Sequence, residues 1–144
     1  MSWSFVVVYA HVVGAVFFVG YFLFWALLTT ATWREFSGTA AERLLQAARA
    51  AAWPLPGYKL SLPLIGWLLL IFMVGSGVLV IVSGTPVTGS LSTEMIHALR
   101  GVKAFLLVAL VACMPRLGAS RAPLAVMSLA LALLIVAVSA QLIR

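Results

Sequence analysis

Four long apolar segments dominate this 144-residue chain. They cover residues 4–30, 62–82, 93–114 and 122–143, and polar stretches separate them. A helix needs about 20 mostly apolar residues to cross the hydrocarbon core of a bilayer. Only 8% of the residues are charged, whereas soluble domains carry about 25%. The sequence therefore predicts an all-α integral membrane protein, with a single domain over residues 1–144 that forms a four-transmembrane-helix bundle.

The stretch between the first two apolar segments is polar and carries its own helix signal. Thr39 and Glu42 fit a capping box, in which a Thr side chain and a Glu three residues later satisfy free backbone N–H groups. Residues 40–53 then read as a short amphipathic helix that Pro54 and Pro56 end. We expect this helix to lie on the cytoplasmic surface of the membrane.

The basic residues near the ends of the segments predict the topology. Two connections carry most of them, and these residues are Arg34, Arg43, Arg49, Lys59, Arg116 and Arg121. The opposite side holds Arg100, Lys103 and Arg144, and its connection over residues 84–92 has no basic residue. Because basic connections stay in the cytoplasm, we expect a bacterial inner-membrane protein with both termini outside. These scattered charges form no run typical of nucleic-acid binding.

The chain has only two histidines, His11 and His97, and this topology places both in the outer half of the membrane. At 1.5 Å rise per residue, His11 lies roughly 10 Å and His97 roughly 6 Å inside its segment. Imidazoles at similar depth on two helices can ligate one metal centre from opposite faces. The sequence therefore favours a b-type haem with His11 and His97 as iron ligands.

Small and cationic residues occur at the same predicted depth. Gly14 is one turn after His11, and Gly75-Ser76-Gly77 enters the outer half from the second apolar segment. We expect Gly14, Gly75 and Gly77 to leave room for a flat ligand. Arg100 and Lys103 follow His97 at steps of three, and a buried charge is costly unless it is paired. These two cations would neutralise the haem propionates.

Two other functions stay open at this point. His11, His97 and Met95, with Met73, could bind copper(I) at the outer leaflet, since thioether and imidazole are ligands that suit it. Two neighbouring cations would oppose copper binding, so haem ranks first. Alternatively, both histidines make only helix contacts, and the protein is a non-catalytic accessory subunit of a larger membrane complex.

Two stretches resemble known bacterial membrane proteins. Tyr9-Ala-His11-Val-Val-Gly14-Ala-Val-Phe-Phe-Val-Gly20 is similar to the first span of copper-resistance-D-like proteins and of HemJ-type protoporphyrinogen oxidases. The stretch from Lys103 to Arg116 resembles a later span of the same proteins, which begins with Lys and ends in a basic turn. The resemblance implies a four-helix core and, in the HemJ-type group, haem b and redox chemistry on a porphyrinogen. His11 and Lys103 would match the histidine and the lysine of that pattern.

Together these observations predict a membrane haem-b protein for electron transfer or haem- or porphyrin-linked redox chemistry. Whether it is an oxidoreductase itself stays open, as do its redox partner, its membership of a larger complex and its self-association. The bilayer is its expected solvent, because so few charges cannot cover a surface in water.

Overall fold

The protein is described by a computed structural model, which covers residues 3–55, 58–82, 92–117 and 122–143. Apart from one short β-hairpin and a single 3-10 turn, every element in this part of the chain is an α-helix. In chain order the elements are α1 (Trp3–Glu35), α2 (Thr39–Ala50), β1 (Ala52–Leu55), β2 (Tyr58–Ser61), α3 (Leu62–Val82), α4 (Thr93–Cys113), the 3-10 turn η1 (Met114–Arg116) and α5 (Ala122–Ile143).

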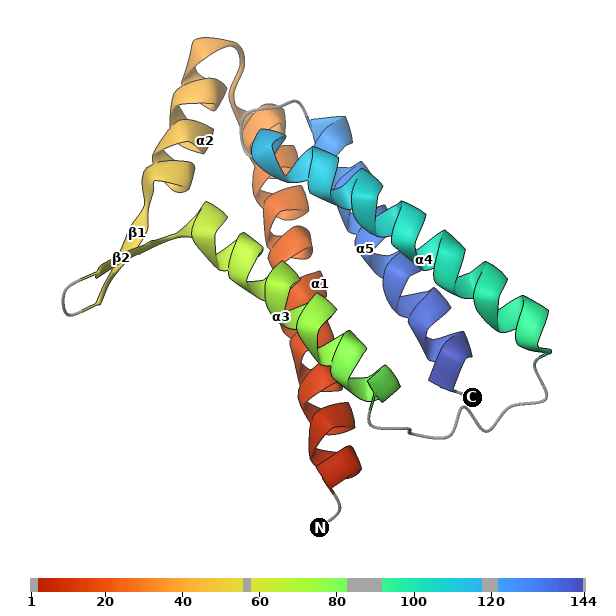
Figure 1. Ribbon diagram of the computed structural model, residues 1–144. Coiled ribbons are helices and arrows are strands. Elements are labelled where there is room, and N and C mark those ends of the chain that lie inside the picture. The colour runs from red at the N-terminus through yellow and green to blue at the C-terminus, as the bar shows by residue number, and fades with distance from the viewer. Residues whose placement is uncertain (1–2, 56–57, 83–91, 118–121, 144) are drawn as a thin grey trace.

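The four long helices run alternately up and down, so that the start of α1 and the end of α5 lie at the same end of the molecule (Figure 1). We call this the terminal end, and we call the opposite end, where α2, the hairpin and η1 lie, the α2 end. Helix α1 packs against α3 and α5, whereas α4 packs mainly against α5 and η1. Helix α1 is therefore the element around which the others are arranged.

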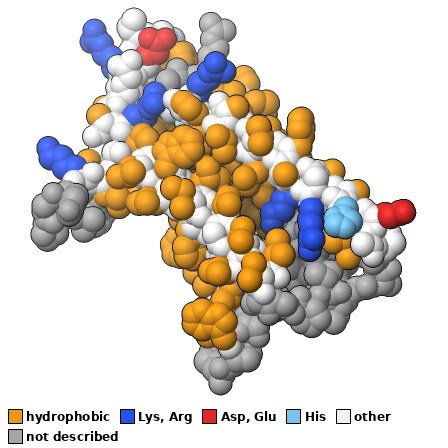
Figure 2. Space-filling view, in the orientation of Figure 1, with side chains coloured by type: hydrophobic (Ala, Val, Ile, Leu, Met, Phe, Trp, Pro, Cys, Tyr) orange, Lys and Arg blue, Asp and Glu red, His pale blue; other side chains and the backbone are white. Residues whose placement is uncertain are grey.

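All four long helices are long and apolar enough to cross a membrane, as the sequence predicts. Large hydrophobic side chains are exposed along each of them, for example Phe17, Ile71, Phe105 and Leu134. Hydrophobic side chains cover most of the visible face, and Lys and Arg gather at the α2 end and along α4 (Figure 2). A surface of this kind suits lipid, since water does not solvate exposed hydrocarbon favourably.

The ends of the helices follow the local sequence signals closely. Pro63 and Pro123 lie in the first turns of α3 and α5, where a missing N–H costs little. Ser92 caps α4 by accepting a hydrogen bond from the Met95 backbone N–H. Pro115 follows α4 and lies in η1. The predicted segments 62–82, 93–114 and 122–143 are thus helices whose limits agree with the prediction to within one residue, whereas α1 runs five residues past the predicted end.

Helix α2 is confirmed as a short amphipathic helix, but its start differs from the prediction. The N-cap is Gly38, with a φ of 58°, and no side chain makes a capping hydrogen bond. The capping box of Thr39 and Glu42 is therefore wrong, because Thr39 is already helical and the turn needs a residue that tolerates positive φ. The fully buried Ala41 and Leu45 face the interior of the protein. Helix α2 contacts α1 and α3, so it packs on the protein as well as facing outward.

The hairpin is a second difference from the sequence prediction, which continued the helix to residue 53. Helix α2 ends at Ala50, and the next residues pair as antiparallel strands, with Ala52 opposite Ser61 and Leu55 opposite Tyr58. The helix thus ends three residues before the predicted end, Pro54 lies in β1, and Pro56 lies outside the described residues. Nothing in the hydrophobic pattern distinguishes a hairpin from a loop. The hairpin brings the chain from α2 directly into α3.

Several features of the topology prediction lie outside the described residues, namely most of the connection over 84–92 and the basic residues Arg121 and Arg144.

Candidate functional site

A buried hydrogen bond between side chains joins His11 of α1 to Ser76 of α3. The Nδ1 atom of His11 lies 2.8 Å from the Ser76 hydroxyl oxygen. Both side chains are buried, with exposed fractions of 6% for His11 and 7% for Ser76. The imidazole is therefore held at a fixed position inside the α1–α3 interface.

The direction of the hydrogen bond between His11 and Ser76 depends on the tautomer of the ring. The Ser76 hydroxyl also lies 3.3 Å from the backbone carbonyl of Met73, one turn earlier on α3. When the hydroxyl donates to this carbonyl, its oxygen accepts from His11 Nδ1–H, and the lone pair of the neutral ring lies on Nε2. Histidines that ligate metals are commonly oriented in this way, by a hydrogen bond from the ring nitrogen that does not bind the metal.

The glycines near His11 lie where α1 and α3 pack together, and they do not leave a slot for a flat ligand. A Cβ added at Gly14 would lie 2.5 Å from Phe72 Cε1 and 3.2 Å from Met73 Sδ. One added at Gly77 would lie 3.4 Å from His11 Cε1. Gly14 therefore allows the close approach of α1 and α3 near His11, whereas a Cβ at Gly77 would make an ordinary van der Waals contact with the His11 ring.

Gly75 differs from these two glycines, because it is exposed and no atom lies within 4 Å of the position of an added Cβ. It faces away from His11 and its neighbours. The three glycines therefore do not form one slot. Gly14 and Gly77 lie at the contact between α1 and α3, and of the three only Gly75 has open space next to it.

Lys103 is the sequence-predicted cation that the structure brings to His11. It comes from α4, is half-buried, and lies within electrostatic range of the imidazole. Helices α1 and α4 both begin at the terminal end (Figure 1). Lys103 lies about 15 Å from the start of α4 and His11 about 12 Å from the start of α1, so the two residues have similar depths. His11 and Ser76 are thus joined by a hydrogen bond, and Lys103 adds a positive charge from α4.

The other predicted residues of α4 lie further out. His97 and Arg100 are exposed, and so is Met95, with an exposed fraction of 52%. They follow one another towards the terminal end of α4, where polar side chains gather (Figure 2). Because α1 packs on α3 and α5 instead of on α4, His97 shares no packed interface with His11. The pairing of the two histidines across one iron stays a prediction.

The donor set constrains what the site can bind. In the part of the chain that the structure describes, no three His, Cys, Asp or Glu side chains group together as they would around a metal ion. A porphyrin supplies four equatorial nitrogens to its iron and needs only one or two axial ligands from the protein. A single oriented imidazole therefore fits haem better than it fits a bare ion.

Ser76 is the member of the site whose role the sequence did not reveal. In the sequence it stands out only as a small residue within Gly75-Ser76-Gly77. A hydroxyl between two glycines in an apolar span is the available signal, because such a residue hydrogen-bonds readily to a neighbouring helix. Without the rotation of α3 about its axis, the partner of that hydroxyl cannot be named.

Comparison of this chain with family models, with curated proteins and with solved structures finds no match to any of them.

Proposed function

We propose that this protein is a multi-pass membrane protein, folded as a four-transmembrane-helix bundle, that binds haem b and takes part in electron transfer or haem- or porphyrin-linked redox chemistry. The observation that carries the proposal is the buried hydrogen bond between His11 Nδ1 and the Ser76 hydroxyl. It supports His11 as the residue that would hold the haem iron. The haem would supply one-electron redox chemistry when bound.

The protein would contribute to haem binding by holding the His11 imidazole in place. Ser76 holds the orientation of the ring through this hydrogen bond, as the outer partners of metal-ligating histidines do. Gly14 supports this by allowing α3 to approach α1 closely. The exposed apolar surface of the four helices keeps the site in a low-dielectric surrounding, where electrostatic interactions are strong.

The cations of α4 would hold the anionic propionates. Lys103 is the first candidate, because it is half-buried and within electrostatic range of His11. Arg100 lies nearly one turn closer to the terminal end and is exposed, which suits a propionate at the membrane surface. His97 remains the candidate for the second axial position, and it is the residue whose role the experiment below decides.

The test is an absorption spectrum of detergent-purified protein, expressed with haem supplied and recorded oxidised and after dithionite reduction. The expected result is a Soret band with reduced α and β bands for the original protein. His11→Ala should abolish the bound haem. His97→Ala should give a high-spin spectrum if His97 is the second ligand and an unchanged one if it is not.

Ser76→Ala and Lys103→Gln refine the assignment. We expect Ser76→Ala to lower haem retention, since loss of an outer partner of a metal ligand typically costs about 10- to 100-fold in affinity. Lys103→Gln should lower retention without changing the ligand spectrum. A colourless protein under haem-replete conditions, or a spectrum that His11→Ala leaves unaltered, contradicts the proposal.

A copper(I) site is the second candidate, and one observation favours it. Met73 is buried in the same interface as His11, and its Sδ lies 3.2 Å from the position of a Cβ on Gly14. A thioether next to an imidazole suits copper(I). The exposed Met95 is less suited than Met73 because it lies on the outer surface of α4. Metal analysis of haem-free protein, with Met73→Leu as the variant that removes the thioether, tests this alternative.

The orientation in the bacterial inner membrane is also a proposal. Arg34, Arg43, Arg49 and Arg116 belong to the elements at the α2 end, and this clustering supports a cytoplasmic α2 end with outward termini. Reporter fusions at the C-terminus test it, since a fusion active only outside the cytoplasm is the expected result. A fusion active only in the cytoplasm contradicts this orientation and leaves the haem proposal standing.

A further inference from the structure

A line of polar side chains runs along α1 at the α2 end, away from the His11 site. Tyr21, Trp25, Thr29 and Trp33 follow one another at intervals of four residues, so they lie along one stripe of the helix. We call these four residues the polar ladder. Trp25 and Thr29 are fully buried and Tyr21 is 8% exposed. The stripe thus points into the protein instead of towards lipid.

Three hydrogen-bonding atoms of the polar ladder have no hydrogen-bond partner among the residues that the structure describes. They are Trp25 Nε1, Thr29 Oγ1 and Trp33 Nε1. The Tyr21 hydroxyl lies close to the Trp25 indole N–H, but the geometry completes no hydrogen bond to that nitrogen. The Tyr21 and Trp25 rings meet edge to face, with centroids 6.4 Å apart. Polar atoms this deeply buried are nearly always satisfied, so three on one stripe require an explanation.

Arg49 places a positive charge beside the polar ladder. It is a half-buried residue of α2, and it lies within electrostatic range of the Tyr21 hydroxyl. One of its terminal nitrogens donates a hydrogen bond to the Pro115 carbonyl at 3.1 Å. This bond holds the guanidinium between α2 and η1. A guanidinium has five N–H donors, and the bond to Pro115 uses one nitrogen only.

These groups lie near the depth of the lipid headgroups. A Cβ at Gly66, in the second turn of α3, would lie 2.5 Å from the Tyr21 Cζ and Oη atoms, so Tyr21 is level with that turn. Trp25 is one turn nearer the α2 end, level with the start of α3. Lipid phosphates lie just outside the hydrocarbon core, at the height where spanning helices begin.

The chemistry of the cluster selects its ligand. An indole N–H can only donate, as can a guanidinium, while a Thr hydroxyl can donate as well. Glu35 and Glu42, the acidic residues of the adjoining segment, are both exposed. A ligand that satisfies this set needs several acceptor atoms and a negative charge. From this geometry we propose that the polar ladder and Arg49 form a binding site for a phosphate group, supplied by the headgroup of an anionic phospholipid.

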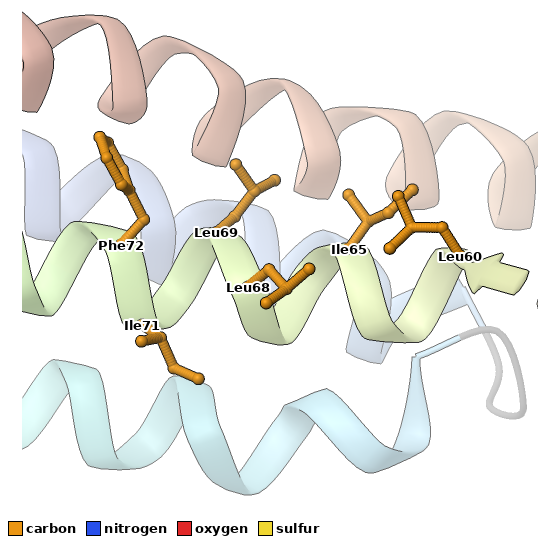
Figure 3. Close-up of a pocket in the computed structure, with 6 residues that line it drawn as sticks. All are labelled: Leu60, Ile65, Leu68, Leu69, Ile71 and Phe72. Carbon is orange, nitrogen blue, oxygen red and sulfur yellow. The ribbon is translucent and has the colours of Figure 1, made fainter. Parts of the chain in front are cut away.

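An apolar pocket that begins at the α2 end and extends to the level of Gly14 supports a lipid as the source of the phosphate. It has a volume of about 500 Å³, begins on strand β2 at Leu60, and continues along α3 to Phe72. Four of its lining side chains, Leu60, Ile65, Leu69 and Phe72, point from β2 and α3 towards α1 (Figure 3). A pocket lined by aliphatic and aromatic side chains suits an acyl chain. A free phosphate would make no use of it.

The test measures thermal unfolding of detergent-purified protein during titration with phosphatidylglycerol or with inorganic phosphate. A ligand that binds only the folded protein raises the melting temperature in proportion to its occupancy. We expect saturable stabilisation by phosphatidylglycerol. Saturable stabilisation by inorganic phosphate at similar concentrations would retain the phosphate site and assign it to a free anion. No saturable response to either compound overturns the proposal.

Thr29→Val is the most informative variant, because it keeps the shape of the side chain and deletes the hydroxyl. Without ligand it should melt at the same temperature as the original protein or higher, since it removes an unpartnered polar group. With phosphatidylglycerol its affinity should fall about tenfold, the effect of one hydrogen bond to a charged group. Unchanged affinity in Thr29→Val contradicts a role for the ladder. Trp33→Phe is the second variant, should Thr29→Val fold poorly.

Arg49→Gln and Arg43→Gln are a matched pair on α2. Both substitutions remove one positive charge from α2. Arg49 is half-buried and belongs to the proposed site, whereas Arg43 is exposed and does not. We expect Arg49→Gln to abolish the response to phosphatidylglycerol and Arg43→Gln to preserve it. Equal losses in both variants would show a non-specific attraction of basic residues to anionic lipid and would overturn the site. Haem spectra of these variants should not change, because Arg49 lies on α2 and the nearest unpartnered ladder residue, Trp25, is about 21 Å along α1 from His11.

Discussion

Replacing Ser76 with Ala tests whether the contact between α1 and α3 is as specific as its geometry indicates. The change removes the 2.8 Å hydrogen bond and leaves His11 Nδ1 without its partner in an interface where both side chains are less than a tenth exposed. A buried donor left unsatisfied costs about 1–3 kcal/mol. Hydrogen bonds between membrane helices contribute about 0.6 kcal/mol on average and about 1.7 kcal/mol at most. We therefore expect Ser76→Ala to lower the free energy of unfolding by about 1–2 kcal/mol.

The assay is equilibrium unfolding in mixed micelles, followed by circular dichroism. Ser128→Ala is the matched control, because Ser128 is also fully buried but bonds only to the Leu124 carbonyl of its own helix, at 2.8 Å. This control should change stability by less than about 0.5 kcal/mol. A double-mutant cycle with His11→Leu should give a coupling energy of about 0.6–1.7 kcal/mol. Equal effects of both serine variants, or strict additivity in the cycle, would refute the reasoning.

Three further substitutions have expected outcomes that thermal unfolding can measure. Gly66→Ala should destabilise the protein by about 1–3 kcal/mol, because its Cβ would lie 2.5 Å from the buried Tyr21 ring; a melting temperature equal to that of the original protein would contradict the close packing. Gly75→Ala should be neutral or stabilising by up to about 1 kcal/mol, since nothing lies within 4 Å of the new atom, and a clear loss of stability would mean that α3 is rotated differently. Ser92→Ala should cost about 1 kcal/mol through loss of the cap on the Met95 N–H, with faster hydrogen exchange confined to the first turn of α4; uniform exchange along α4 would contradict this.

The number and limits of the long helices could be predicted because each rests on a local signal. Apolar length identifies a segment, and Pro63, Pro115 and Ser92 mark where helices begin or end. These signals act within one or two turns of chain, so no knowledge of the partner helix is needed. The extension of α1 to Glu35 was missed for the same reason, since residues 31–35 contain no helix breaker and the apolar pattern ends before the helix does.

The site was predictable only in part, because a site depends on how each helix is rotated about its axis. A helix that is apolar all round carries no amphipathic pattern to fix that rotation. His11 was identified, but its partner Ser76 and the different roles of Gly14 and Gly75 follow from contacts between helices. The polar ladder shows the same limit, since its spacing of four is visible in the sequence but its burial is not.

Helix α1 also has a mechanical consequence, because it is continuous from His11 to Trp33. These residues are about 33 Å apart along a rod that contains no proline or kink signal. A tilt of about 5° pivoted at His11 would move the far end by about 3 Å, which is more than half of one helical turn. Helix α1 therefore moves as a rigid rod. A ligand that shifts one end of α1 displaces the other end, together with α2 and its arginines.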